Sequence, residues 1–225
     1  MKPLINLMIY LLLSWCFSCD KDKTENGDIV IEESTPLIDY DGNTYKTVRI
    51  GDQIWMAENL KTTRYSDGTA IPSLVYNNND SNLSKFGRLY TWTAAMRNSA
   101  SSSTNPSNVQ GVSPVGWHIP SEAEWMELIN NLGGASTAGG KMKSTSTDYW
   151  LSPNTGASNE SLLNVLPSGF YRFDGVFMKM SEWAIFLTSN TSSPITIMTI
   201  KYDRASVAFE QWHPSDVVSV RCVKD

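Results

Sequence analysis

The sequence predicts a mostly antiparallel α+β domain with one or two helices and long loops. Two pairs of β-prone runs each surround a short turn that contains glycine, one pair over residues 45–56 around Gly51-Asp52 and one over residues 170–178 around Asp174-Gly175. Such pairs predict β-hairpins. Alternating side chains over residues 195–200 and 218–223 predict two further strands.

One segment has the start, face and end of an amphipathic helix. Ser121 follows Pro120 and precedes Glu124 by three residues, which is the capping-box pattern. Gly133-Gly134 ends the helix. Its apolar face is formed at helical spacing by Trp125, Leu128, Ile129 and Leu132.

The segments between these elements are shorter or more polar. A short helix is expected over residues 90–96, with Leu89, Trp92 and Met96 facing inward. Residues 99–108 and 135–147 are rich in small and polar side chains, which predicts exposed loops.

The N-terminus has the layout of a cleaved signal peptide over residues 1–18. Lys2 precedes an apolar run over residues 4–13, and small or reactive residues follow it. A transmembrane helix needs about 20 apolar residues, whereas the chain turns strongly charged over residues 20–23. We therefore expect export and removal of the segment rather than a permanent span.

Cys19 is the expected site of lipidation, because the residues before it resemble a bacterial lipobox. Cys16 is the alternative, but it has the bulky Trp15 at the cleavage position, whereas Cys19 has Ser18. Two or more acyl chains anchor a protein stably, since each buried methylene contributes about 0.8 kcal/mol. Residues 19–36 would then be a lipidated N-terminus and a flexible tether.

The charged residues 20–23 also bear on location. They resemble the signal that sends lipoproteins of Bacteroides-like bacteria to the outer face of the outer membrane, with an ordinary charged tether as the alternative interpretation. The expected location is the outer membrane, with the domain anchored by lipid at the cell surface.

The cysteine count and the net charge argue against an intrachain disulfide and against a nucleic-acid partner. Cys16 leaves with the signal peptide and Cys19 carries lipid, so Cys222 has no partner for an intrachain disulfide in the mature protein. Residues 37–225 form one domain that is large enough to be held together by its core. The net charge of −5 argues against a nucleic-acid partner.

Several ordered motifs lie along residues 37–225. They are Asp41-Gly42-Asn43-x-Tyr45, Ile50-Gly51-x-Gln53-x-Trp55-Met56-Ala57-Glu58-Asn59-Leu60, Gly116-Trp117-His118-Ile119-Pro120-Ser121-x-x-Glu124-Trp125 and Ser219-Val220-Arg221-Cys222. In this order they resemble the Fibrobacter succinogenes major paralogous domain, which occurs in exported bacterial proteins. Its members commonly carry Cys-Pro where this chain has Ser113-Pro114, so the resemblance implies that Cys222 has lost a partner.

The last two motifs are also similar to segments of the formylglycine-generating and sulfatase-modifying group. That group has a C-type-lectin-like fold, and the resemblance implies the same fold here. Its activity is not implied, because the copper-binding cysteine pair of that group has no counterpart in the mature chain. The sugar-binding calcium signatures of true C-type lectins are missing as well.

The sequence predicts no metal, no cofactor and no catalytic residues. His118 and His213 are the two histidines of the chain, and no second metal ligand stands at regular spacing from His118. Asp39-x-Asp41-x-Asn43 resembles the start of a calcium loop, but Ile50 occupies the position of the bidentate Glu.

A non-catalytic binding or adhesion module for a glycan or for a host or envelope protein is the favoured function. The candidate ligand residues are Trp212, His213 and Asp216 in the segment 210–216, together with Asn77 and Asn79. A tryptophan packed in a long hairpin turn is the alternative for that segment. A structural envelope protein without a small ligand, or an uncharacterised surface enzyme, is the alternative for the whole chain.

Overall fold

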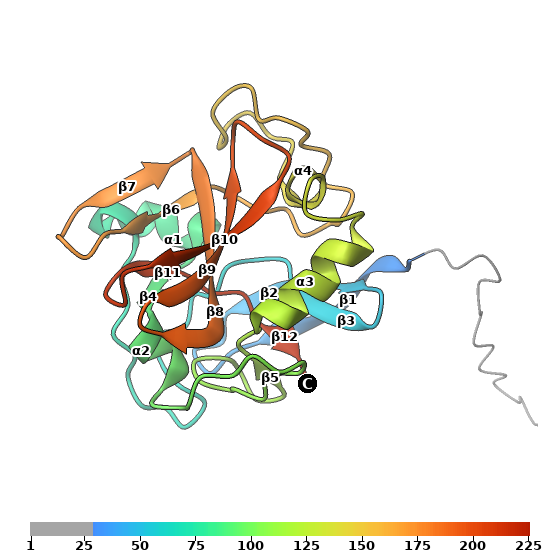
Figure 1. Ribbon diagram of the computed structural model, residues 1–225. Helices are drawn as coiled ribbons and strands as arrows, with labels where there is room; N and C mark the ends of the chain where they lie inside the picture. The colour runs from blue at the N-terminus through green and yellow to red at the C-terminus, as the bar shows by residue number, and fades with distance from the viewer. Residues whose placement is uncertain (1–28) are drawn as a thin grey trace, which may run out of the picture.

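The computed structural model describes residues 29–225 (Figure 1). The signal peptide expected over residues 1–18, the lipidation site Cys19 and the tether up to residue 28 lie outside the described residues. In the part of the chain that is described, no helix is long and apolar enough to cross a membrane.

The first sheet gathers strands from both ends of the domain. Its order is β1-β2-β3-β12-β5, and every pair is antiparallel. Gly51, with φ +60°, turns the chain between β2 and β3, which confirms the hairpin expected over residues 45–56. The five strands are β1 (Ile31–Ile38), β2 (Thr44–Ile50), β3 (Gln53–Met56), β5 (Trp117–His118) and β12 (Val223–Lys224).

The folded part of the chain begins earlier than the sequence indicated. Residues 31–36, expected in the tether, form the first part of β1 and pair with β2, with Ile31 opposite Ile50. β1 is an edge strand whose side chains are mostly exposed. An edge strand is held by backbone hydrogen bonds and needs few apolar side chains, so its polar composition resembled that of a linker.

The second sheet is built from the C-terminal half of the domain. Its order is β10-β9-β8-β11-β6-β7, and β4 also pairs with β11. The β8–β11 pair is parallel and the others are antiparallel. The β6–β7 hairpin and strand β9 confirm two expectations. The strands are β4 (Leu89–Thr91), β6 (Ser168–Tyr171), β7 (Phe177–Met180), β8 (Trp183–Ser192), β9 (Ile195–Lys201), β10 (Val207–Trp212) and β11 (Val217–Ser219).

The single strand expected over residues 218–223 is divided between the two sheets. β11 belongs to the second sheet and β12 to the first, and the chain crosses between them over residues 220–222. The backbone there still has partners, because the amide of Leu60 donates to Val220 O at 2.9 Å and the amide of Met56 donates to Cys222 O at 3.0 Å. This crossing places Arg221 inside the protein, where it is 2% exposed.

The predicted capped helix is α3 (Glu122–Asn131), and both halves of its capping box are formed between Ser121 and Glu124. The short helix expected over residues 90–96 is α2 (Trp92–Met96), preceded by β4. Three further short helical segments precede β4 in the chain. They are η1 (Tyr76–Asn78), η2 (Asp80–Asn82) and α1 (Leu83–Phe86).

The loop expected over residues 135–147 instead contains a short buried helix, α4 (Ala138–Met142). Its composition is polar, but Gly139 and Gly140 lack a Cβ and so allow the backbone at Ala205 and Gly156 to approach closely. Lys143 after this helix is fully buried, and its Nζ donates to three backbone carbonyls, those of Thr155, Lys201 and Arg204, at 2.8, 3.2 and 3.0 Å.

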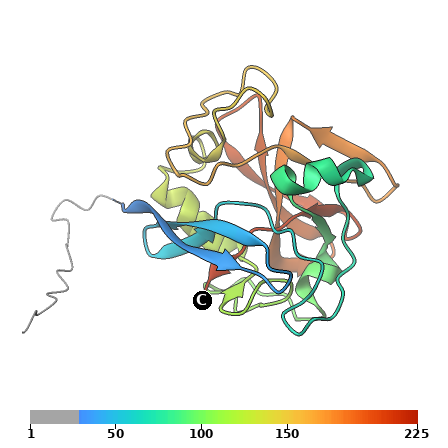
Figure 2. The same cartoon turned by 180° about the vertical axis from the view of Figure 1, so that it is seen from behind.

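Helix α3 fills the space where the two sheets meet. The ring of Trp125 lies 4.4 Å from that of Trp55 in β3 and 5.5 Å from that of Phe186 in β8. Leu128 and Ile129 are fully buried in the same cluster. Figures 1 and 2 show α3 with β1, β2 and β3 on one side of the molecule and the β6–β7 hairpin on the other.

Candidate functional site

Trp212 ends strand β10, and its contacts are internal. Its ring lies 4.5 Å from that of Phe170 and 6.2 Å from that of Trp183. The indole Nε1 donates to Glu210 Oε2 at 3.0 Å. These contacts account for the position of Trp212 without a ligand.

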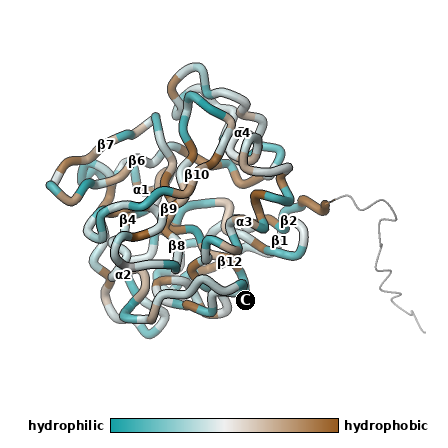
Figure 3. Tube along the Cα trace, viewed as in Figure 1, coloured by the Kyte–Doolittle hydropathy of each residue, from teal (hydrophilic) through white to brown (hydrophobic). Residues whose placement is uncertain are grey.

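His213 and Asp216 lie next to Trp212 and hold the turn that follows β10. The Asp216 carboxylate is buried and accepts hydrogen bonds from the amides of Phe173 at 2.8 Å and His213 at 3.1 Å. The exposed His213 ring packs on Phe173 at 4.5 Å. Phe173 and Val176, at the tip of the β6–β7 hairpin, are 58% and 47% exposed, and Figure 3 shows hydrophobic and hydrophilic colours side by side at this end of the hairpin.

Asn77 and Asn79 lie on the other face of the β6–β7 hairpin. Both are exposed, and the ring of the adjacent Tyr76 packs on Phe177 of β7 at 5.1 Å. The contacts of Trp212 with β6 are on the opposite face, since successive side chains of a strand alternate. The structure therefore brings three of the predicted ligand residues together but separates the two asparagines from them.

His118 is buried between two carboxylates. Its Nε2 lies 2.5 Å from Glu124 Oε1, and its Nδ1 lies 2.6 Å from Asp225 Oδ1. Burial lowers the pKa of His118, but the hydrogen bonds to the two carboxylates outweigh burial and leave the pKa raised. The imidazole thus joins the start of α3 to the last residue of the chain.

The segment that resembles a calcium loop forms a turn with internal partners. The Asp39 carboxylate accepts from the amide of Asn43 at 2.9 Å and from Tyr45 Oη at 2.6 Å. Asp41 accepts from the amide of Thr63 at 2.6 Å. Within residues 29–225, no group of three or more His, Cys, Asp and Glu side chains is placed to hold a metal ion.

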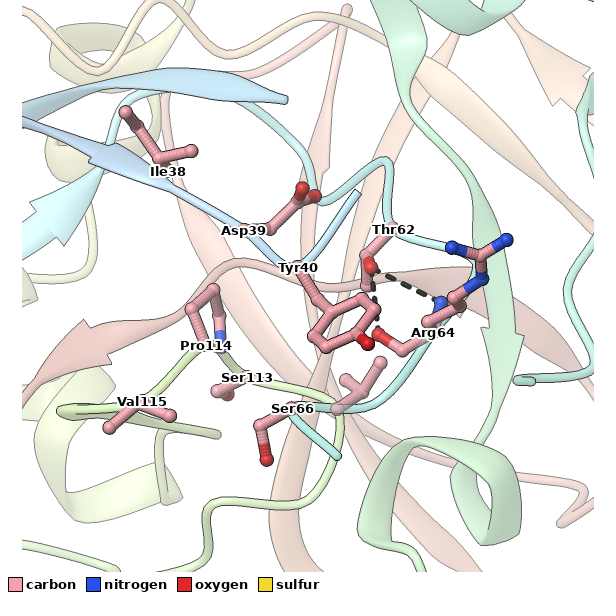
Figure 4. Close-up of a pocket in the computed structure, with 10 residues that line it drawn as sticks. Ile38, Asp39, Tyr40, Thr62, Arg64, Ser66, Ser113, Pro114 and Val115 are labelled. Atoms are coloured by element: carbon pink, nitrogen blue, oxygen red, sulfur yellow. Dashed lines mark hydrogen bonds between the residues drawn. The ribbon is translucent and has the colours of Figure 1, made fainter. Parts of the chain in front are cut away.

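A shallow cavity of about 230 Å³ lies beside this turn (Figure 4). Figure 4 shows the ring of Tyr40 between the Ser113–Val115 segment and the Thr62–Arg64 segment. A neighbouring cavity of about 340 Å³ shares Ser66 and Val115 with it and extends to His118.

Ser113, at the floor of the first cavity, is fully buried and lies beside Cys222. Burial raises the pKa of the Cys222 thiol to about 12, although a contact with Ser113 works in the opposite direction. The Ser113 Oγ has no hydrogen bond of ordinary geometry to any described residue. Residues 113 and 222 are therefore neighbours, as the departure from the family pattern implied.

A larger cavity, of about 460 Å³, opens over Arg221 and is called the Arg221 cavity below. Its walls come from β1, β2, the segment after β3, helix α1 and the loop over residues 159–166. The side chains that matter for its chemistry are those of Lys46, Glu58, Ser84, Lys85, Asn159, Asn164 and Arg221.

Arg221 uses only part of its hydrogen-bonding capacity on the protein. Nε donates to Asn59 Oδ1 at 3.0 Å, and Nη1 donates to the carbonyls of Leu163 at 2.7 Å and Met56 at 3.4 Å. Within the described part of the chain, Nη2 donates to no residue. Burial lowers the pKa of Arg221 to about 9, against the opposing effect of Glu58, so the group is still a cation at neutral pH.

Glu58, the carboxylate whose charge acts on Arg221, forms its ion pair with Lys61. Glu58 Oε2 lies 2.7 Å from Lys61 Nζ, and Glu58 Oε1 accepts from the amide of Lys46 at 3.1 Å. Burial raises the pKa of Glu58, but these hydrogen bonds outweigh burial and lower it. Glu58 is therefore ionised and paired with Lys61, and no carboxylate of the described residues is hydrogen-bonded to Arg221.

The loop that forms one wall is conformationally unusual. Asn159, Leu162 and Asn164 have φ of +53°, +60° and +47°. Left-handed backbone costs roughly 1–2 kcal/mol for an ordinary L-residue such as leucine, and such strain is concentrated at functional sites. Leu162 and Asn164 are exposed and line the cavity.

Sequence reasoning did not assign this site. Arg221 was visible as a charged residue within the apolar run over residues 218–223 and as part of a motif, but nothing local indicated that the run leaves one sheet and enters another. The motifs do meet in space. Trp55 contacts Trp125, His118 contacts Glu124 and Asn59 contacts Arg221.

Two mostly antiparallel sheets, one capped helix at their junction and short helices elsewhere define an α+β domain with a polar cavity over a buried arginine. The model of the Fibrobacter succinogenes major domain family matches residues 48–224, and the chain belongs to this family. No curated protein and no solved structure matched the chain.

Proposed function

We propose that this chain is a cell-surface lipoprotein whose domain is a non-catalytic binding module, with the Arg221 cavity as its ligand site. The main support is the side chain of Arg221, which is 2% exposed and lines an open cavity. Its Nη2 donates no hydrogen bond to any described residue. Buried charged groups are normally paired. A ligand in the cavity would complete the hydrogen bonds of Arg221.

The hydrogen bonds of two other buried groups, His118 and Lys143, support a binding role over a catalytic one. Both ring nitrogens of His118 are hydrogen-bonded to carboxylates. Lys143 directs all three of its N–H groups to backbone carbonyls. These groups hold the framework, whereas the cavity offers amides, a hydroxyl and cations that suit recognition.

The display of this module at the cell surface is part of the proposal. Export and lipidation at Cys19 are supported by the sequence layout of the N-terminus. A C-type-lectin-like relation is supported by the sequence resemblance and by the pairing of β12, near the C-terminus, with β3. The long connection over residues 143–167, outside both sheets, agrees with that relation.

Filling the cavity tests the proposed ligand site. Ser84 lies on α1, is exposed and lines the cavity, so Ser84→Trp should occupy it without disturbing the core. Ser81→Trp, on the neighbouring η2 and away from the cavity, is the matched control. We expect glycan or matrix-protein array signals for wild type and Ser81→Trp, their loss for Ser84→Trp, and equal thermal midpoints.

Other results would change the assignment. Blank arrays for the wild-type chain would favour a structural envelope role. Signals that survive Ser84→Trp would place the ligand elsewhere, with the surface around Trp212 next to be tested.

A further inference from the structure

We propose that the ligand of the Arg221 cavity is a saccharide that carries a single carboxylate, such as a uronic or sialic acid, with its carboxylate at Nη2 of Arg221. This inference rests on the proposed function. It adds the chemical class of the ligand.

The first support is that no carboxylate of the described residues is hydrogen-bonded to Arg221. Three of its five N–H groups donate to neutral acceptors, and the ionised carboxylate of Glu58, whose charge acts on Arg221, is itself paired with Lys61. A buried cation without a hydrogen-bonded counter-ion is costly. An anionic group in the cavity would supply that counter-ion.

The charged side chains at the rim of the cavity are mostly positive, as Arg221 is. Lys46 and Lys85 are exposed and line it, and within residues 29–225 Lys46 forms no ion pair. Lys85 Nζ lies 5.2 Å from the ring of Tyr149, a contact that leaves its charge uncompensated. Glu33 is the one other carboxylate at the rim, and it is exposed. The cavity is therefore locally positive in a chain whose net charge is −5.

The charges that line the cavity favour one carboxylate over a phosphate. A guanidinium fork, in which two nitrogens donate in parallel, binds carboxylate and phosphate alike. Here Nε and Nη1 are occupied by Asn59, Leu163 and Met56, so the fork is closed and Nη2 alone is available. Glu33 and Glu58 line the same cavity, and they repel a doubly charged phosphate more strongly than a singly charged carboxylate.

The remaining polar groups of the cavity match hydroxyls. The side chains of Ser84 and Asn164 are exposed to the cavity and form no hydrogen bond among the described residues. The Asn159 side chain accepts from the amide of Asn164 at 2.8 Å, which leaves its Nδ2 as a donor. Amide and hydroxyl groups beside a cation fit a sugar acid better than a purely aliphatic carboxylate.

The test compares matched sugars on the full chain by isothermal titration calorimetry or saturation-transfer NMR. The pairs are D-glucuronate with D-glucose, D-galacturonate with D-galactose, and N-acetylneuraminate with its methyl ester, and glucose 6-phosphate and glucose 6-sulfate are added. At least one acid should bind about 10- to 100-fold more tightly than its neutral partner, as expected for hydrogen bonds to charged groups, and more tightly than the phosphate or sulfate.

Variants separate recognition from folding. Lys46→Gln with Lys85→Gln changes only exposed side chains and should weaken the acid several-fold and reduce its salt dependence. Arg221→Gln should abolish the preference for the acid if its thermal midpoint shows that it folds. Ser84→Trp should remove all binding.

The outcomes distinguish the two proposals. Equal affinity for acid and neutral sugar, lost in Ser84→Trp, would overturn the carboxylate inference and keep the ligand site. Tighter binding of the phosphate or sulfate would also overturn it. No binding of any sugar, or binding that Ser84→Trp does not affect, would overturn this inference together with the proposed site for saccharides.

Discussion

Replacing Ser113 by Cys should create a disulfide with Cys222. The two side chains are fully buried neighbours, and the Ser113 Oγ is already close enough to affect the pKa of the thiol. Ser113 also has a hydroxyl without an ordinary hydrogen-bond partner among the described residues. Loss of that hydroxyl therefore removes no hydrogen bond of ordinary geometry, and an unsatisfied buried hydroxyl costs about 1–3 kcal/mol.

The size of the effect follows from the loop that the bond would close. Residues 113 and 222 enclose roughly 110 residues, for which the chain-entropy model gives about 5 kcal/mol of stabilisation at 25 °C. Engineered bridges commonly deliver less, so we expect about 2–5 kcal/mol. For a domain of this size, that corresponds to a rise in Tm on the order of 10 °C.

The assay needs a background with Cys16→Ala and Cys19→Ala, so that one thiol pair remains. Burial raises the pKa of Cys222 to about 12, which makes its thiolate scarce in the folded protein, and thiolate is the reactive form. The variant should therefore be refolded under oxidising conditions. Guanidinium denaturation with and without reductant gives the stability difference, and Ser113→Ala is the control, expected to be no less stable than wild type.

The reasoning would be refuted in either of two ways. Two titratable thiols after oxidative refolding would show that residues 113 and 222 are not neighbours. An oxidised variant no more stable than its reduced form would show that the bond strains the crossing over residues 220–222.

Three further predictions concern the framework and the anchor. Leu128→Ala should lower the free energy of unfolding by about 2–5 kcal/mol, as for a buried leucine; an unchanged denaturation midpoint would contradict the packing of α3. The raised pKa of His118 means that its pairing with Glu124 and Asp225 stabilises the fold fully below the unfolded value of about 6.5 and is lost as pH rises through the folded pKa. Urea titrations should therefore show stability falling above about pH 6.5, and His118→Gln should flatten that slope. Metabolic labelling with an alkyne palmitate should tag wild type but not Cys19→Ala, and loss of label in Cys16→Ala alone would move the anchor.

The elements predicted correctly from sequence are those fixed by local chemistry. Helix α3 is specified by Ser121, Glu124 and a run of apolar residues at helical spacing, all within a few turns of chain. The two hairpins are specified by turns whose residues lie between the paired strands. These features need no distant partner, so they can be recognised in the linear sequence.

The two segments that were predicted wrongly, residues 31–36 and residues 135–147, are held by backbone contacts and not by a local pattern of side chains. β1 is held by backbone pairing with β2, and α4 is buried because Gly139 and Gly140 admit distant backbone. Neither cause leaves an apolar periodicity that sequence analysis can detect. Polar composition was therefore a poor guide to exposure in both segments.

By itself, the sequence determined the family of this chain, its α+β class and the capped helix, because each depends on residue identity or on neighbours along the chain. The tertiary structure alone decided where the candidate site lies. Arg221 is set by partners 58 to 165 residues away, namely Leu163, Asn59 and Met56. Arg221 lies at the point where the chain crosses between the two sheets, and its Nη2 has no partner among the described residues. Long-range pairing of this kind is not encoded in any short segment of the sequence.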